Sequence, residues 1–307
     1  MKLSIVIPLK NERESLRPLA DAIVKAVGPL GLEYELVFVD DGSTDGSFDA
    51  IRALKASCGA RLRAFRFSRN YGKSAALATG IARAEGDIIV TMDADLQDDP
   101  AVVPDLLKKI DEGYDLVSGW KKIRHDPVSF TVPSRIWNLA TSLISGVRLH
   151  DFNCGLKAYR AATAKSLEIY GERHRYLPVL AHWDGWRVTE IPVTHHERRF
   201  GKSKYGFSKF FKGFLDLLTL LFLRRYLRSP LHFFGLVGFL LIAAGAAVLC
   251  YFGVQWLVTG AMHIRPLTLL SVAAVIMGIQ FLSFGFLAEM LAHVSARPQY
   301  NVRETLE

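Results

Sequence analysis

The sequence predicts an α/β domain built on a parallel sheet, followed by a hairpin of two membrane-spanning helices. Short apolar runs alternate with amphipathic segments through the first half of the chain, which is the pattern of βαβ units. Three of these runs end in polar residues, and two long uncharged stretches lie near the C-terminus. A chain of 307 residues has room for one α/β domain of roughly 200 residues and a separate membrane segment.

The expected strands are short runs rich in Val, Ile and Phe, each bounded by polar residues. They cover 3–8, 34–39, 62–67, 87–92, 115–118 and 186–193. Amphipathic segments predict helices over 12–27, 47–56, 74–84 and 100–112. Beyond residue 120 the pattern becomes irregular, and no internal repeat is visible.

Two C-terminal stretches, 229–264 and 266–288, contain no Asp, Glu, Lys or Arg. Each is longer than the roughly 20 residues that cross a bilayer. We expect transmembrane helices at about 231–258 and 267–290, within a membrane domain at 229–294, and a tail at 295–307. Core helices of a soluble protein are the alternative. The small residues Gly235, Gly238 and Gly245 would permit close helix contact, including contact between copies of the chain.

Basic residues predict which side of the membrane the α/β domain faces. Lys209, Lys212, Arg224, Arg225 and Arg228 precede the first span, Arg297 and Arg303 follow the second, and the loop between carries Arg265. The positive-inside rule therefore predicts a multi-pass protein of the cytoplasmic (inner) membrane with its α/β domain in the cytoplasm. We expect no secretory signal, because the first apolar run is too short. The three cysteines show no disulfide or metal spacing.

The net charge of +8 raises the question of nucleic acid binding. Much of the basic excess lies near the apolar spans, so we expect no nucleic acid partner but an anionic membrane surface and phosphorylated substrates. Segment 206–228 has an apolar face interrupted by charges and is expected to lie at the membrane surface. An ordinary surface helix is the alternative.

The ends of the first, second and fourth expected strands carry the chemistry. These ends hold Asn11 and Glu12, then Asp40 and Asp41, then Asp93 and Asp95. Open α/β sheets bind ligands at the carboxyl edge of their strands, and spaced carboxylates are ligands for Mg²⁺ or Mn²⁺ holding a diphosphate. Taken alone, the turn after Asp41 fits a helix N-cap at Ser43 or Asp45 equally well.

The ordered motifs resemble a family 2 glycosyltransferase of the GT-A (Rossmann-like) fold. They are Val6-Ile-Pro8 with Asn11-Glu12, Val39-Asp-Asp-Gly-Ser-Thr-Asp45, Asn70-Tyr-Gly-Lys-Ser-Ala-Ala76 and Asp93-Ala-Asp-Leu-Gln97. The pattern is most similar to polyprenyl-phosphate glycosyltransferases, the group that includes dolichol-phosphate mannose synthase. The resemblance covers nearly the whole chain and implies a catalytic domain over 1–205.

This resemblance assigns roles to the strand-end residues. It implies a nucleotide pocket of Pro8, Asn11, Glu12, Asp40, Asp41 and Ser43, closed on the donor side by Asn70, Gly72 and Lys73. It places Asp93 near the donor ribose or the metal, and gives Asp95 and Gln97 to the divalent ion. A cap of the helix near Pro100 is the alternative for Gln97 and Asp98.

A basic loop at 194–205 resembles the family's flexible loop over the donor phosphates. Its cations are Arg198, Arg199, Lys202 and Lys204. A solvated charge run near the membrane is the alternative. His195 and His196 are interpreted as loop residues, because adjacent histidines point apart and no third ligand is evident. A P-loop is excluded, since Phe67 and His196 stand where that motif needs glycine.

The region 120–150 corresponds to the part of the family that receives the lipid phosphate. The resemblance implies Lys121, Arg124, Ser134 and Arg135 as its anchors, with a second interfacial helix over 136–145. Lys121 departs from the pattern, because related enzymes often carry arginine after this strand. Asp151 matches a position discussed as catalytic in relatives, and a capping or structural aspartate is the alternative.

A phosphate acceptor explains the density of cations. Lipid phosphate and donor diphosphate repel each other, and a divalent ion with several Lys and Arg offsets that repulsion. A phosphate monoester with a second pKa near 6 needs no strong general base. The Gln-x-x-Arg-Trp motif of processive synthases is absent. We therefore expect one inverting transfer from a UDP- or GDP-linked sugar to undecaprenyl or dolichyl phosphate. Transfer to a non-phosphate membrane acceptor and a catalytically inactive scaffold are the alternatives.

Overall fold

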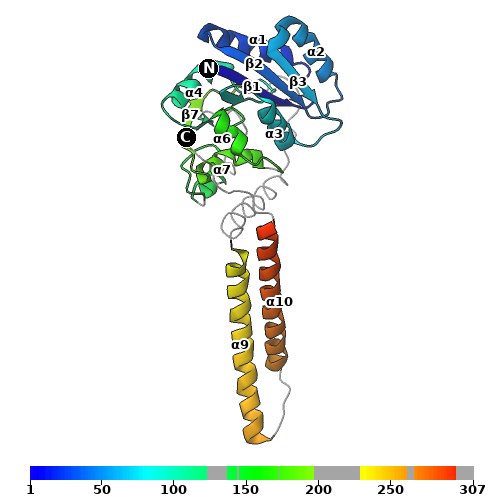
Figure 1. Cartoon of the computed structure of the whole chain (residues 1–307), viewed down its shortest axis with the longest axis vertical. Coiled ribbons are helices and arrows are strands. Elements are labelled where there is room, and N and C mark those ends of the chain that lie inside the picture. The colour runs from blue at the N-terminus through cyan, green and yellow to red at the C-terminus, as the bar shows by residue number, and fades with distance from the viewer. Residues whose placement is uncertain (123–136, 144, 172, 197–228, 261–265, 295–307) are drawn as a thin grey trace, which may run out of the picture. The chain divides into compact units, whose positions relative to one another are not determined.

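The computed structural model describes residues 1–122, 137–143, 145–171, 173–196, 229–260 and 266–294. The chain divides into two compact units, Met1–Gly213 and Phe214–Glu307. The first unit contains a seven-stranded sheet with helices on both faces, and the second contains two long helices (Figure 1). Each unit is described separately below.

The sheet of the first unit is mixed and not fully parallel. Its strands are β1 (Lys2–Leu9), β2 (Glu33–Asp40), β3 (Leu62–Arg66), β4 (Ile88–Thr91), β5 (Leu116–Lys121), β6 (Lys157–Arg160) and β7 (Val188–Val193). They are ordered β3-β2-β1-β4-β6-β5-β7. The pairs among β1 to β4 and the pair β5 with β7 are parallel, whereas β6 runs antiparallel to β4 and β5.

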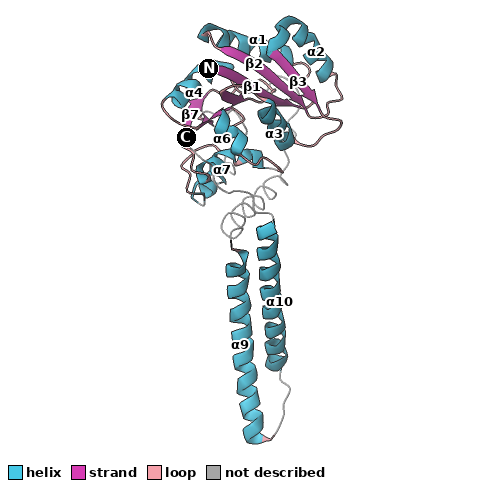
Figure 2. Cartoon of the chain, viewed as in Figure 1, coloured by secondary structure: helices cyan, strands magenta, loops and turns pink. Residues whose placement is uncertain are grey.

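Helices cover both faces of this sheet (Figure 2). The α-helices are α1 (Leu16–Val27), α2 (Ser47–Cys58), α3 (Lys73–Arg83), α4 (Val103–Asp111), α6 (Ala161–Ser166) and α7 (Leu177–Trp183). Short 3₁₀ turns are η1 (Gly28–Leu30), η2 (Gly59–Arg61), η3 (Pro100–Val102) and η4 (Arg173–Arg175). Residues 137–143 are also helical.

Two buried apolar clusters fill the space between helices and sheet, one on each face. Leu3, Ile5 and Ile7 of β1 point to the face covered by α1, α2 and α4. Val6 points to the opposite face, where residues of α3, α6 and α7 are buried. Alternate side chains of a strand point to opposite faces, so a continuous apolar run such as β1 indicates a strand covered on both sides.

The expected α/β fold is confirmed, and one strand was missed. Each of the six expected strands is present within a few residues of its expected bounds. The seventh strand, β6, contains four residues, and its sequence Lys-Ala-Tyr-Arg has charges at both ends. Because it inserts between β4 and β5 in antiparallel orientation, the expectation of a parallel sheet was wrong in this part.

The second unit contains α9 (Pro230–Thr259) and α10 (Pro266–Val294), which lie side by side. Their mean hydropathies are 2.5 and 2.1, and only 11% of each apolar window is buried within the protein. Helices this apolar and this exposed are long enough to cross a membrane, whereas core helices of a soluble protein are mostly buried. A Cβ atom at Gly238 would lie 2.7 Å from the carbonyl oxygen of Gly278, so the two backbones approach closely there.

Candidate active site

The ends of β1 and β2 are joined by hydrogen bonds between polar residues. The backbone N–H of Asn11 donates to Ser43 Oγ at 2.9 Å, and the N–H of Thr44 donates to Asn11 Oδ1 at 2.9 Å. The N–H of Glu12 donates to Ser47 Oγ at 3.1 Å. Asn11 adopts a positive φ of 56°, which Asn tolerates better than most residues. These contacts fix the loops at the carboxyl edge of the sheet.

Asp40 lies at this edge as the last residue of β2. In the pairing of β1 with β2, Pro8 lies opposite Val39, the residue before Asp40. Pro8 and Asp40, two of the residues expected at the nucleotide, therefore lie at the same sheet edge. Asp40 is fully buried, its Oδ1 accepts the N–H of Ser43 at 2.8 Å, and its Oδ2 lies 3.6 Å from Arg66 Nε. The carboxylate is therefore held in one orientation by the turn that follows it.

Asp41 connects the end of β2 to the loop before α3. It accepts the backbone N–H of Tyr71 at 2.6 Å and that of Gly72 at 3.0 Å. Asn70 Oδ1 also accepts the N–H of Gly72, at 3.1 Å. Gly42 has a φ of 68°, and a Cβ there would lie 2.6 Å from the backbone of Arg69. Asp41 thus positions this loop.

Asp93 follows β4 and pairs with Lys73, the first residue of α3. The Lys73 amine lies 2.6 Å from Asp93 Oδ1 and 2.8 Å from Oδ2. Burial alone would raise the pKa of Asp93, but Lys73, with smaller contributions from Lys121 and Lys157, lowers it to about 2. A Cβ at Gly155 would lie 2.5 Å from Asp93 Oδ2, so glycine is needed beside this carboxylate.

A second group of side chains could bind a metal ion and consists of Asp95, Gln97 and His195. Asp95 is buried, and its Oδ1 accepts the N–H of Gln97 at 3.2 Å. The side-chain Nε2 atoms of Gln97 and His195 are 3.5 Å apart, and His195 forms an isolated β-bridge with Asp98. The backbone N–H of His196 donates to the carbonyl oxygen of Gln97 at 2.9 Å.

These contacts place His195, expected to be a loop residue, against the segment that follows β4. The chain beyond β7 returns to the segment after β4, so a histidine distant in sequence reaches Gln97. Carboxylate and amide oxygens and an imidazole nitrogen are a suitable donor set for Mn²⁺. Within the described part of the chain, no cluster of three His, Cys, Asp or Glu is already assembled for a metal. A cation held here would need further ligands from its substrate or from water.

Lys121 and Asp98 form a buried ion pair at 3.3 Å. Although burial lowers the pKa of a lysine, Asp98 and neighbouring acidic groups raise that of Lys121 above its usual range. Lys121 is therefore a fixed cation at the end of β5. Asp151 is 1% exposed, and its Oδ1 accepts the N–H of Asn153 at 3.0 Å. That hydrogen bond fits the turn-capping alternative for Asp151.

The helix at 137–143 presents an apolar surface. Leu139 and Leu143 are 62% and 75% exposed, while the polar Asn138 and Thr141 are buried. Asn138 donates from Nδ2 to the carbonyl oxygen of His150 at 2.9 Å, which anchors the helix to the following segment. Exposed leucines over buried polar residues fit the expected interfacial helix.

The remaining expected residues lie outside the described part of the chain. They are Arg124, Ser134, Arg135, Arg198, Arg199, Lys202 and Lys204, with segment 206–228 and the tail 295–307.

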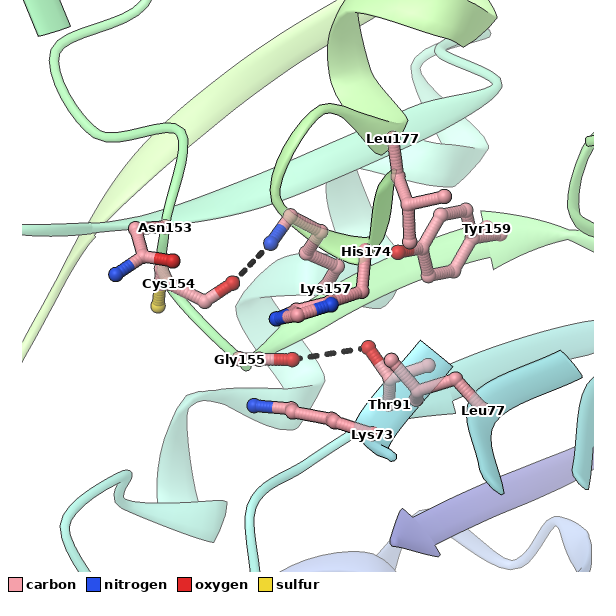
Figure 3. Close-up of a pocket in the computed structure, with 10 residues that line it drawn as sticks. All are labelled: Lys73, Leu77, Thr91, Asn153, Cys154, Gly155, Lys157, Tyr159, His174 and Leu177. Carbon is pink, nitrogen blue, oxygen red and sulfur yellow. Dashed lines mark hydrogen bonds between the residues drawn. The ribbon is translucent and has the colours of Figure 1, made fainter. Parts of the chain in front are cut away.

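A small pocket beside Asp93 contains residues that sequence reasoning missed (Figure 3). Lys157 of β6 and His174 of η4 both line it, together with Lys73 of α3. His174 Nδ1 lies 2.9 Å from Ser74 Oγ, and burial together with nearby Lys73 and Arg175 lowers the His174 pKa to about 2. Little in the sequence indicated this pocket, because Lys157 belongs to β6, a strand of four residues that is too short to recognise.

Comparison with known proteins places this geometry in a family. The model for Glycosyl transferase family 2 matches residues 4–167. A dodecaprenyl-phosphate galacturonate synthase from Rhizobium johnstonii is 38% identical over 100% of this chain and 94% of the relative. An undecaprenyl-phosphate 4-deoxy-4-formamido-L-arabinose transferase from Edwardsiella ictaluri is 36% identical over 99% of this chain and 94% of its own length.

The fold is also found in a solved structure of a different enzyme. Glucosyl-3-phosphoglycerate synthase from Mycobacterium tuberculosis, in complex with Mn²⁺, uridine diphosphate and phosphoglyceric acid, matches with a TM-score of 0.56 and 20% identity. The match covers 73% of this chain and 78% of that one. Together with the polar residues at the ends of β1, β2 and β4, these matches show that the chain belongs to glycosyl transferase family 2.

Proposed function

We propose that this protein transfers a sugar from a nucleotide-sugar donor to a polyprenyl phosphate at the cytoplasmic face of the membrane. The observation that carries the proposal is the meeting of Asp95, Gln97 and His195 at the carboxyl edge of the sheet. The two relatives that match nearly the whole chain are named for polyprenyl-phosphate sugar transfer. Their names specify different sugars, so the family alone leaves the sugar open.

The residues at the sheet edge divide into those that would bind the nucleotide-sugar donor and those that would bind the metal ion. Pro8, Asn11, Glu12, Asp40 and Ser43 would line the nucleotide pocket, and Asp41 would hold the loop that carries Asn70 and Lys73. Asp95, Gln97 and His195 would hold Mg²⁺ or Mn²⁺, with Asp93 close by. When bound, such an ion neutralises diphosphate charge and makes the nucleoside diphosphate a better leaving group.

The acceptor phosphate would approach from the side of Lys121, the fixed cation at the end of β5. Arg124, Ser134 and Arg135 would complete its binding, and Arg198, Arg199, Lys202 and Lys204 would close over the donor phosphates. The phosphate oxygen attacks the anomeric carbon, the bond to the nucleoside diphosphate breaks, and the configuration inverts. Because the acceptor is largely ionised at pH 7, no strong base has to remove a proton.

The long apolar helices α9 and α10 would place this reaction at a membrane. Domain limits of 1–205 for catalysis, 206–228 for the interface and 229–294 for the hairpin fit that arrangement. The exposed Leu139 and Leu143 would lie towards the lipid. The acceptor is then delivered within the bilayer and needs no soluble carrier.

The deciding experiment uses the purified full chain in detergent with undecaprenyl phosphate, Mn²⁺ and a set of labelled nucleotide sugars. We expect a lipid-linked product that mild acid releases, as for a sugar on a lipid monophosphate. Asp95→Asn should abolish turnover while the protein remains folded. A product that resists mild acid would favour a non-phosphate acceptor, and full activity of Asp95→Asn would contradict the metal role.

A further inference from the structure

The pocket next to Asp93 contains more positive than negative groups. Its described lining residues come from separate elements and include Lys73, Lys157 and His174, but no Asp or Glu. Lys73 is already paired with Asp93, whose carboxylate borders the pocket at Gly155. Lys157 is the second lysine of this pocket, and its surroundings differ from those of Lys73.

Lys157 is buried, and its hydrogen-bond partner is a backbone carbonyl rather than a carboxylate. Its side chain is 3% exposed, and its amine donates to the backbone carbonyl of Cys154. No salt bridge joins it to a carboxylate within the described residues. Burial lowers the pKa of Lys157 and the nearby Lys73 lowers it further, whereas Cys154, Asp151 and Asp93 partly offset this effect. Because Asp93 is also paired with Lys73, a buried ammonium at Lys157 is only partly compensated, and an anion that arrives with a ligand would complete its counter-charge.

Hydrogen-bond donors converge on the same space (Figure 3). His174 Nδ1 faces Ser74 Oγ at 2.9 Å, and Ser74 Oγ also receives the backbone N–H of His174 at 3.3 Å. When the Ser74 hydroxyl donates to Nδ1, the proton of the neutral imidazole is on Nε2. The pocket thus offers an imidazole N–H and two lysine amines.

The pocket is distinct from the residues that would hold the metal. Asp95, Gln97 and His195 are not among its lining residues, whereas Lys73 links it directly to Asp93. Its cavity volume is about 10 Å³, close to the room that one water molecule needs. A substituent of the sugar fits such a space better than a sugar ring or a diphosphate.

We propose that this pocket binds a carboxylate on the donor sugar. The donor substrate is then a nucleotide-linked uronic acid. Lys157 is the specificity-determining residue, because it supplies the charge that the carboxylate matches. His174 adds a hydrogen bond. A neutral hydroxymethyl group in the same place would add no charge to the partial compensation that the amine receives from Asp93 and Asp151. The inference rests on the proposed function, in which the donor sugar lies beside Asp93.

Matched donors test this directly, without any variant. The full chain in detergent with Mn²⁺ is titrated by calorimetry with UDP-glucuronate against UDP-glucose, UDP-galacturonate against UDP-galactose, and GDP-mannuronate against GDP-mannose. Members of each pair differ only in the carboxylate. We expect the acid member of at least one pair to bind roughly 10-fold or more tightly than its neutral partner. Equal or tighter binding of the neutral member in every pair would overturn the proposal.

The variant Lys157→Met distinguishes recognition of the sugar carboxylate from recognition of the donor phosphates. We expect it to weaken binding of the preferred acid donor by roughly 10- to 100-fold, with little effect on the neutral partner or on UDP and GDP alone. An equal loss for the acid donor and the free nucleotide would assign the amine to phosphate and overturn the proposal. Lys165→Met, at an exposed position of α6, is the matched control and should change nothing.

Folding of the variant is checked by its thermal unfolding midpoint, which should not fall, because a buried and only partly compensated charge is replaced by an apolar chain of similar length. Transfer to undecaprenyl phosphate is measured separately. A lipid-linked sugar formed without preference for the acid would overturn this inference and keep the proposed function. Acid-selective binding without any lipid product would overturn the proposed function, and no binding of any probe would overturn both.

Discussion

The amine of Lys73 lies 2.6 Å from one carboxylate oxygen of Asp93 and 2.8 Å from the other. The pair joins the first residue of α3 to the segment that follows β4. Their side chains are 35% and 28% exposed, so the ion pair lies at the border of the protein interior. It holds the Asp93 carboxylate in a single orientation.

The first prediction concerns the coupling between these two residues. Lys73→Met and Asp93→Asn should each lower the free energy of unfolding, whereas the double variant should lose less than the sum of the two. Because both side chains are about a third exposed, we expect a coupling energy of about 1 kcal/mol. Urea unfolding of the four proteins measures it. Additive losses would show that the pair contributes no interaction energy.

A second prediction tests the histidine that the fold brings to Gln97. His195→Ala should lower the affinity for Mn²⁺ by roughly 10- to 100-fold, because a nitrogen ligand is lost. The neighbouring His196 supplies a matched control, since its side chain is 47% exposed and lies 3.4 Å from Asp99. His196→Ala should leave the Mn²⁺ dependence of transfer unchanged. Similar Mn²⁺ curves for the two variants would exclude His195 as a ligand.

The sequence was sufficient to predict the strand-end residues because they follow local rules. Parallel neighbours place their carboxyl ends at one edge, so Asn11, Asp40 and Asp93 had to lie near one another once three strands were identified. The long apolar helices were predictable for a similar reason, since their signal lies within one continuous segment.

The parts that escaped prediction depend on contacts distant in sequence. His195 meets Gln97 only because the chain after β7 returns to the segment after β4. Lys157 became an inward-facing cation because β6, four residues long, inserts between β4 and β5. Neither the insertion of β6 nor the return of the chain after β7 leaves a periodic pattern in the sequence. The burial of Lys157 depends on all the elements that surround it.

The third prediction concerns acid stability and His174. Its pKa is lowered to about 2, first by burial and then by nearby Lys73 and Arg175. The unfolded chain, with a histidine pKa near 6.5, binds a proton that the folded protein does not bind, so stability falls as pH drops below about 6.5. Between pH 6.5 and 5 this residue should cost roughly 2 kcal/mol of unfolding free energy.

The measurement is urea unfolding of the full chain in detergent at several pH values. His174→Gln removes the titrating group and should flatten this part of the stability curve. His182→Gln, at an exposed position of α7, should keep the original slope. If His174→Gln retains the full acid sensitivity, the loss of stability has another source.

The fourth prediction concerns the packing of α9 against α10. A Cβ at Gly238 would lie 2.7 Å from the carbonyl oxygen of Gly278, whereas a Cβ at Gly253 would meet nothing within 4 Å. Both glycines lie inside α9, where alanine improves helix propensity by about 1 kcal/mol. Gly253→Ala should therefore preserve or raise the thermal stability of the hairpin, while Gly238→Ala should lower it through backbone separation. The two variants are compared by thermal melting in micelles, followed by the helical circular dichroism signal. Equal shifts of their melting temperatures would show that the close approach at Gly238 does not hold the helices together.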